Sequence, residues 1–372
     1  MPAPKFFKRL LFLISLGMAG ALILALLAMY ISPETIWMLA FMGLTFPLLI
    51  LANFLLFLIW LFIYPRRALI QALVLIIAYP FFRDIFNFTN RFEESIPDEN
   101  SFIVMSYNVR LFDLYNWTSN KKTRDSIINL VHTANADIVC FQEFFHEDTG
   151  KFNTLDTLKK TLSANKVHID YSAHVKNVNH WGIATFTRFP IVGKGKLEFP
   201  DETDNISIFT DLRIGEDTIR VYNLHLESVR FRSEDYKALE SITGKPDETG
   251  LGGPQKILTR MRRAYIRRAR QTDIISTHIS ESPYPVIVCG DFNDPPASYA
   301  YHQISATLED AFNSSSAGFG ATYSGKIPFL RIDYVLYDEE HFGCDTMQVL
   351  QKEFSDHFPL KAVMNFKSKK TD

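Results

Sequence analysis

The chain has 372 residues, of which 47% are hydrophobic and 22% are charged, and its formal net charge at pH 7 is -2. This length allows one large domain or two ordinary ones, and the small net charge excludes bulk attraction to nucleic acid or anionic lipid. Any such binding must depend on local patches. The cysteines fit neither a disulfide framework nor a zinc pattern, so we expect Cys140, Cys289 and Cys344 to be packing residues.

The N-terminal part of the sequence is almost entirely apolar. Residues 10–31 carry no charge and are long enough to span the ~30 Å hydrocarbon core of a bilayer. A second uncharged stretch covers residues 36–64, and a shorter one covers residues 68–82. We predict three transmembrane helices over these ranges, within a membrane anchor of residues 1–82. The first two contain no Asp, Glu, Lys or Arg, which argues against a transporter.

Basic residues predict the orientation of this anchor. Lys5, Lys8 and Arg9 place the N-terminus in the cytoplasm, and Arg66 with Arg67 place the second loop there as well. Three spans would put the C-terminal domain outside the cytoplasm, whereas a third stretch that does not cross would leave it inside. We expect an integral protein of a cell membrane, such as a bacterial inner membrane, with an extracytoplasmic C-terminal domain.

The remainder of the chain reads as a soluble α/β domain between a linker at 83–100 and a polar tail at 367–372. Strand-like apolar runs recur at 101–107, 137–141, 181–187, 190–198, 206–213, 218–226, 285–290, 331–337 and 359–365. Helical patterns lie between them at 121–134, 151–164 and 257–280. Because strands outnumber helices and several follow one another directly, we predict mixed sheets with outer helices. Residues 228–256 are polar and Gly-rich, which is typical of a long functional loop.

Polar side chains recur at or near the ends of these apolar runs. They are Asn108 after SFIVMSY, Glu143 after ADIVCFQ, His225 within IRVYNLHLES, Asp291 and Asn293 after PVIVCG, Asp333 within RIDYVLY, and Asp356 with His357 within FSDHFP. A single stretch of this kind indicates a turn, but several together indicate a shared site. Each residue also has a structural alternative; Asp333, for example, could pair with Arg331.

These residue types have a common chemical use. Hard oxygen ligands without thiolates suit Mg²⁺ or Mn²⁺, which bind substrate phosphate. Two histidines can act as acid and base near neutral pH, and a carboxylate can fix the tautomer of an imidazole. Together these groups fit the attack of water on a phosphate ester.

The motifs SYNVR, FQE, NLHLES, GDFND, RIDYVL and SDHFP, in this order, resemble those of the endonuclease/exonuclease/phosphatase superfamily. Its members include pancreatic-type deoxyribonucleases and neutral sphingomyelinases. The resemblance implies a catalytic domain at 101–366. It also implies an α/β fold, a four-layer sandwich of two packed mixed β-sheets flanked by helices, here preceded by the transmembrane segment.

The resemblance also implies roles for individual residues. Glu143 would be the direct carboxylate ligand of Mg²⁺, or of Mn²⁺ in its place. Asn108 would help to hold the metal, and Asp356 would support the metal or its waters. His357 would be the general base on the attacking water, oriented by Asp333.

Further residues would meet the substrate. Asp291 and Asn293 would position the nucleophile and the phosphate, and His225 would stabilise the phosphate or protonate the leaving group. His180 and Trp181 precede the family-like stretch GIATFTRFPI and could also contact substrate.

We therefore predict a metal-dependent hydrolase of phosphate esters, foremost a phosphodiesterase acting on nucleic acid or a phospholipid. The lipid bilayer would be its partner through the N-terminal helices, with no obligate protein partner evident. The alternative is a non-catalytic, membrane-anchored binding or scaffold protein on the same fold. The basic helix at 260–270 could meet phosphates or be a solvated outer helix. The other histidines, including His146 and His174, are expected to be surface or packing residues.

Overall fold

The computed structural model describes residues 5–87, 100–201, 204–229, 252–325 and 329–367. Most of the predicted linker 83–100, of the loop 228–256 and of the tail 367–372 therefore lies outside the described residues.

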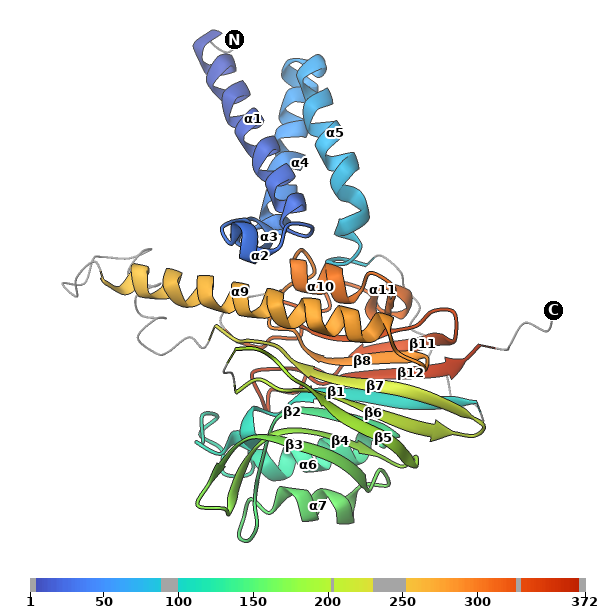
Figure 1. The fold of residues 1–372 in the computed structure, drawn as a ribbon. Helices are drawn as coiled ribbons and strands as arrows, with labels where there is room; N and C mark the ends of the chain where they lie inside the picture. Colours follow the sequence, from blue (N-terminus) through green and yellow to red (C-terminus); the bar gives the residue numbers. More distant parts are fainter. Residues whose placement is uncertain (1–4, 88–99, 202–203, 230–251, 326–328, 368–372) are drawn as a thin grey trace.

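The N-terminal part of the chain is helical. Its elements are α1 (Lys5–Leu27), α2 (Pro33–Ile36), α3 (Leu39–Leu44), α4 (Phe46–Ile63) and α5 (Pro65–Phe82). α1, α4 and α5 are long and apolar enough to cross a membrane, and they stand away from the sheets (Figure 1). The predicted span at 36–64 is divided among α2, α3 and α4. Pro47 has no N–H to donate and fits only the first turn of a helix, so α4 begins beside it at Phe46.

Polar side chains join the long apolar helices to one another. Trp60 Nε1 donates to Ser15 Oγ at 2.8 Å, and Gln71 Nε2 donates to the Ser15 carbonyl at 3.0 Å. Asn53 Nδ2 donates to the carbonyl of Met18 at 3.1 Å. Because a polar group without a partner is costly in apolar surroundings, these bonds fix how α1, α4 and α5 pack together.

The rest of the chain forms two sheets of six strands each. The first has the order β11-β12-β1-β2-β4-β3. Its strands are β1 (Ser101–Asn108), β2 (Ile138–Glu147), β3 (Lys166–Val175), β4 (Asn179–Thr187), β11 (Phe342–Val349) and β12 (Leu360–Phe366). The second has the order β5-β6-β7-β8-β10-β9. Its strands are β5 (Ile191–Leu197), β6 (Ser207–Ile214), β7 (Asp217–His225), β8 (Val286–Asp291), β9 (Glu309–Asp310) and β10 (Asp333–Tyr337).

Both sheets are mixed, and helices cover their outer faces. β1 pairs with β2 and β7 pairs with β8 in parallel, while the other ladders are antiparallel. The helices are α6 (Thr123–Ala134) and α7 (Thr154–Thr161) outside the first sheet, and α9 (Gly252–Ser280), α10 (Tyr299–Ile304) and α11 (Ala311–Ser315) on the side of the second (Figure 1). The predicted four-layer α/β sandwich is confirmed.

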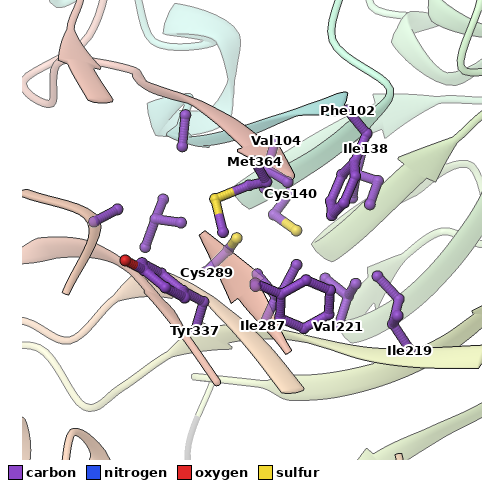
Figure 2. Packing of buried hydrophobic residues seen from close by; sticks show 14 of the residues in the cluster. Phe102, Val104, Ile138, Cys140, Ile219, Val221, Ile287, Cys289, Tyr337 and Met364 are labelled. Atoms are coloured by element: carbon purple, nitrogen blue, oxygen red, sulfur yellow. The ribbon is translucent and has the colours of Figure 1, made fainter. Parts of the chain in front are cut away.

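An apolar core fills the space between the two sheets. Val104 and Cys140 reach into it from the first sheet, and Val221 and Cys289 from the second (Figure 2). Burial of one aliphatic side chain of this kind stabilises the fold by roughly 1.5–3 kcal/mol. Cys344 is partly buried against the same cluster, and all three thiols are free. This packing holds the sheets in a fixed relation, so that the strand ends of both meet at one edge.

Candidate active site

The predicted site residues lie where strands of both sheets end or begin at one edge of the sandwich. Asn108, His225 and Asp291 are the last residues of β1, β7 and β8, and Asp333 is the first residue of β10. In the ladders, Asp291 is paired with both His225 and Asp333. His357 lies just before β12. The parallel pairing of β8 with β7 and its antiparallel pairing with β10 thus bring together residues that are far apart in the sequence.

His357 is held between two carboxylates. Its Nδ1 lies 2.9 Å and 3.1 Å from the two carboxylate oxygens of Asp333, and its Nε2 lies 3.8 Å from Asp291 Oδ2. Burial alone would lower the pKa of His357, but the charges of Asp333 and Asp291 outweigh burial and raise it well above its usual value. Asp333 does not pair with Arg331, the alternative partner considered for it. Arg331 Nη1 instead lies 2.6 Å from Asp310 Oδ2.

Asp291 and Asn293 form a tight turn at the end of β8. The Asn293 amide donates to Asp291 Oδ1 at 2.8 Å, and Asn293 Nδ2 donates to the carbonyl of Leu226 at 3.0 Å. Asn293 has a φ of 53°, a left-handed conformation that Asn tolerates better than most residues. Burial raises the pKa of Asp291 to about 6; His357 opposes this shift and Asp333 adds to it. Asp291 thus faces the site as a desolvated carboxyl group.

Glu143 lies within a β-bulge of β2 rather than at the end of the strand. The register with β4 shifts between Phe141 and Phe144, and Glu143 has a φ of 48°. Bulges re-aim side chains beside active sites, and here the bulge directs the carboxylate of Glu143 towards Asn108, whose Nδ2 lies 3.4 Å away. Burial and the nearby Asp356 raise the pKa of Glu143.

Asn108 lies between the carboxylates of Glu143 and Asp291 and contacts both. Its Nδ2 also donates to Asp291 Oδ2 at 3.0 Å, and its Oδ1 accepts from the Arg110 amide at 3.1 Å. If the Asn108 amide were turned by about 180°, its Oδ1 would face the site in place of its Nδ2.

Asp356 is positioned by residues that were not predicted. Arg110 Nε lies 3.2 Å from Asp356 Oδ2, and Ser355 Oγ donates to the Asn108 carbonyl at 2.8 Å. Arg110 has a φ of 44°, within a left-handed turn that continues to Asp113. Both residues fall inside the quoted motifs SYNVR and SDHFP, so their place in these motifs was the available signal.

His225 faces the carboxylates from the second sheet. Its Nε2 lies 3.8 Å from Glu143 Oε1 and 3.9 Å from Asp291 Oδ2. These distances are longer than hydrogen bonds but keep a protonated imidazole close to both charges.

His180 and Trp181 lie on β4, where they are paired with His146 and Phe145 of β2. Trp181 packs on Phe145 with ring centroids 4.9 Å apart, and His180 Nε2 lies 3.0 Å from Asp148 Oδ1. Their contact with substrate stays a prediction. The basic helix at 260–270 is part of α9, where Arg268 is buried and contacts Asp294 at 2.8 Å.

Comparisons with known proteins identify the family. A sequence model of the Endonuclease/Exonuclease/phosphatase family matches residues 105–357. This range contains every catalytic and metal-binding residue predicted above. The chain belongs to this family. A second match, to a Domain of unknown function (DUF8431), covers residues 8–85 and hence the apolar helices. No curated protein matches the chain.

Solved structures of low sequence identity share the fold. An endonuclease/exonuclease/phosphatase from Beutenbergia cavernae has a TM-score of 0.52 at 15% identity, over 73% of this chain and 72% of that chain. The catalytic domain of human nocturnin has a TM-score of 0.51 at 19% identity, over 74% and 98%. A family protein from Bacteroides thetaiotaomicron has a TM-score of 0.50 at 18% identity, over 74% and 100%.

Family membership makes this endonuclease/exonuclease/phosphatase protein a metal-dependent hydrolase of phosphate esters. The side chains around Glu143 fit a divalent cation. Glu143 and Asp291 both contact Asn108 Nδ2, and the pKa of Glu143, raised by burial and by the charge of Asp356, means that its charge is poorly compensated by the protein alone. A cation bound to these oxygens would supply the positive charge that the protein itself does not provide there.

Proposed function

We propose that this enzyme is a Mg²⁺-dependent phosphodiesterase in which His357 activates the attacking water. The observation that carries this proposal is the position of His357. Its Nδ1 is held by Asp333 at 2.9 Å, while its Nε2 points to the oxygen-rich side of the site, 3.8 Å from Asp291. This is the arrangement expected of a general base whose tautomer is fixed by a carboxylate.

The tasks of this reaction are divided among the site residues. Asp333 accepts a hydrogen bond from Nδ1–H of His357, which leaves the lone pair on Nε2 free to take a proton from water. Asp291 and Asn293 orient that water and the phosphate, and His225 stabilises the phosphate or protonates the leaving oxygen. Glu143, with Asn108 and Asp356, would hold Mg²⁺, or Mn²⁺ in its place, which would neutralise charge on the phosphate oxygens.

A non-catalytic scaffold on the same fold is the competing function. Loss of activity usually leaves gaps in a catalytic set, whereas here the acids, amides and histidines of the set lie within reach of one another. Burial raises the pKa of both Asp291 and Glu143, and carboxyl groups desolvated in this way cluster at active sites.

Two substitutions in the full-length protein test the catalytic proposal. Glu143→Gln and His357→Ala should each lower hydrolysis of a chromogenic phosphodiester in Mg²⁺ by at least about 100-fold. His132→Ala, at an exposed position on α6, is the matched control and should retain wild-type activity. Wild-type rates in both active-site variants, or equal rates with EDTA, would sink the assignment.

The substrate class needs a panel of natural phosphodiesters. We propose nucleic acid or a phospholipid, and the panel contains plasmid DNA, RNA, sphingomyelin and phosphatidylinositol phosphates. A nuclease should show a steep loss of rate with salt, because phosphate contacts release counterions. A lipid hydrolase should instead prefer substrate in a bilayer over the same lipid in monomeric form.

We further propose that α1, α4 and α5 anchor the enzyme in a cell membrane, with the catalytic domain at 101–366 outside the cytoplasm. Support comes from the apolar side chains that these helices expose, such as Phe62 at 86% and Ile76 at 69%. The basic residues at the N-terminal ends of α1 and α5 favour this orientation. A reporter fused to the C-terminus should be active only outside the cytoplasm; a cytoplasmic signal would mean that α5 does not cross.

A further inference from the structure

A second group of metal-ligating side chains lies beyond the active site, where β2 meets β4. His146, Asp148 and His180 each present a ligand atom, and these atoms all lie within 4.8 Å of one another. His146 is paired with His180 in the antiparallel ladder, and Asp148 follows directly after β2. Because paired residues on antiparallel strands point to the same face, the two imidazoles meet, with ring centroids 4.6 Å apart.

Neighbouring side chains hold these ligands in position. His174 Nδ1 lies 2.7 Å from His180 Nδ1, on the opposite side of the ring from the Nε2 that faces Asp148 at 3.0 Å. The Tyr171 hydroxyl lies 2.6 Å from His146 Nε2. Partners on the outer side of metal-binding histidines fix the tautomer and the ring orientation, and this cluster contains one for each histidine.

We propose that His146, Asp148 and His180 form a Zn²⁺ site. Two imidazoles and one carboxylate are a donor set that zinc favours, with a fourth position left for water. The side chain of Asp148 is 49% exposed and that of His180 is 13% exposed, while His146 is buried. The cluster is therefore open to entry of an ion on one side and anchored in the fold on the other.

This site is separate from the one proposed around Glu143. Glu143 precedes His146 by three residues on β2, or about 10 Å at the usual rise of a strand. The donors differ as well, since the Glu143 site is rich in oxygen and the His146 site in nitrogen. Zinc at the second site would fasten the tip of the β3–β4 hairpin to the end of β2.

Cobalt titration of the full-length protein in detergent tests the site, since tetrahedral Co²⁺ with imidazole ligands absorbs visible light. The protein is stripped with EDTA, dialysed into excess Mg²⁺ and titrated with Co²⁺, and Zn²⁺ is then added to displace it. We expect one equivalent of Co²⁺ to bind with a visible spectrum in the wild type and in Glu143→Gln. His180→Ala should weaken this binding by more than about 100-fold, whereas His132→Ala should not.

Asp148→Asn is a second variant at an exposed position, and circular dichroism of each variant checks that it is folded. It should also weaken Co²⁺ binding, and Zn²⁺ should raise the melting temperature of the wild type but not of either variant. Unchanged Co²⁺ binding in both folded variants would overturn the proposal, and so would a spectrum that Glu143→Gln abolishes. The three ligands and their partners Tyr171 and His174 would then form a hydrogen-bonded cluster without metal.

Discussion

His357 has a carboxylate beside each ring nitrogen, and only one of them is within hydrogen-bond distance. In the proposed reaction neutral imidazole is the base, so activity should fall as the pH drops below the pKa of His357. Asp333 raises that pKa, so Asp333→Asn should move the acidic limb of the kcat–pH profile to lower pH. It should also lower kcat by about 10²–10⁴-fold, because the tautomer is no longer fixed. If the acidic limb of the profile does not move, a group other than His357 controls it.

Glu143 should destabilise the metal-free protein when it is ionised. Its pKa is raised by burial and by Asp356, so the penalty is absent below the usual carboxyl pKa and grows as the pH rises through the folded-state value. The side chain is 34% exposed and thus partly screened, so Glu143→Gln should raise the metal-free melting temperature at pH 7 by only about 1 °C. Scanning fluorimetry should also show that Mg²⁺ stabilises the wild type more than the variant. Equal stabilisation by Mg²⁺ would exclude Glu143 as a ligand.

The sequence carried enough information to choose candidate active-site residues that the fold brings together, but not to predict their contacts. Asn108, Glu143 and His357 fall in short motifs, and the fold brings them to one edge. The bulge that turns Glu143 was not predicted, because it depends on the pairing of β2 with β4. His146 and His174 were expected to be surface or packing residues, since nothing in a single strand shows which residue lies opposite on its neighbour.

Gly290 allows β8 to approach β7 closely just before Asp291. A Cβ at this position would lie 2.1 Å from the carbonyl oxygen of Leu224, so one of the two backbones would have to move. Gly290→Ala should therefore destabilise the domain by about 2–4 kcal/mol and misplace Asp291, with a matching loss of activity. Gly215→Ala is the control: its φ is also positive, but nothing lies within 4 Å, and it should cost about 1 kcal/mol in urea unfolding. Equal costs in the two variants would remove the packing explanation.

Strands with an apolar face were predictable, whereas the two edge strands of the first sheet were not. β1, β8 and β10 are buried along nearly their whole length and read as apolar runs in the sequence. β3 and β11 are absent from the predicted strands, and they are the two edges of the first sheet. Both are partly exposed along most of their length without a regular alternation and contain several polar residues, so no hydrophobic period distinguishes them from loops.

The helical and catalytic parts of the molecule are in direct contact. Arg270 of α9 lies 2.5 Å from Glu34 of α2, and the ring of Tyr30 packs on that of His302 in α10 at 4.4 Å. Just after the C-terminal end of α5, the carbonyl of Asp84 accepts a hydrogen bond from Arg331 Nη2 at 2.6 Å. With contacts on two sides, the catalytic domain is held in one orientation on the apolar helices, with α9 and α10 facing them (Figure 1).

Gly43 lies at the centre of this contact and provides its test. A Cβ there would lie 2.2 Å from the carbonyl oxygen of Ala297, so Gly43→Val should force α3 away from the catalytic domain. Cysteines at positions 34 and 270, joined by a short bismaleimide, should then cross-link several-fold more slowly than they do with Gly43 intact. Gly20→Val on α1, where nothing lies within 4 Å, should leave the cross-linking rate unchanged. Because the site is built from strand ends, hydrolysis of a soluble phosphodiester should survive Gly43→Val. Unaltered cross-linking would mean that the two parts are not held together through this contact.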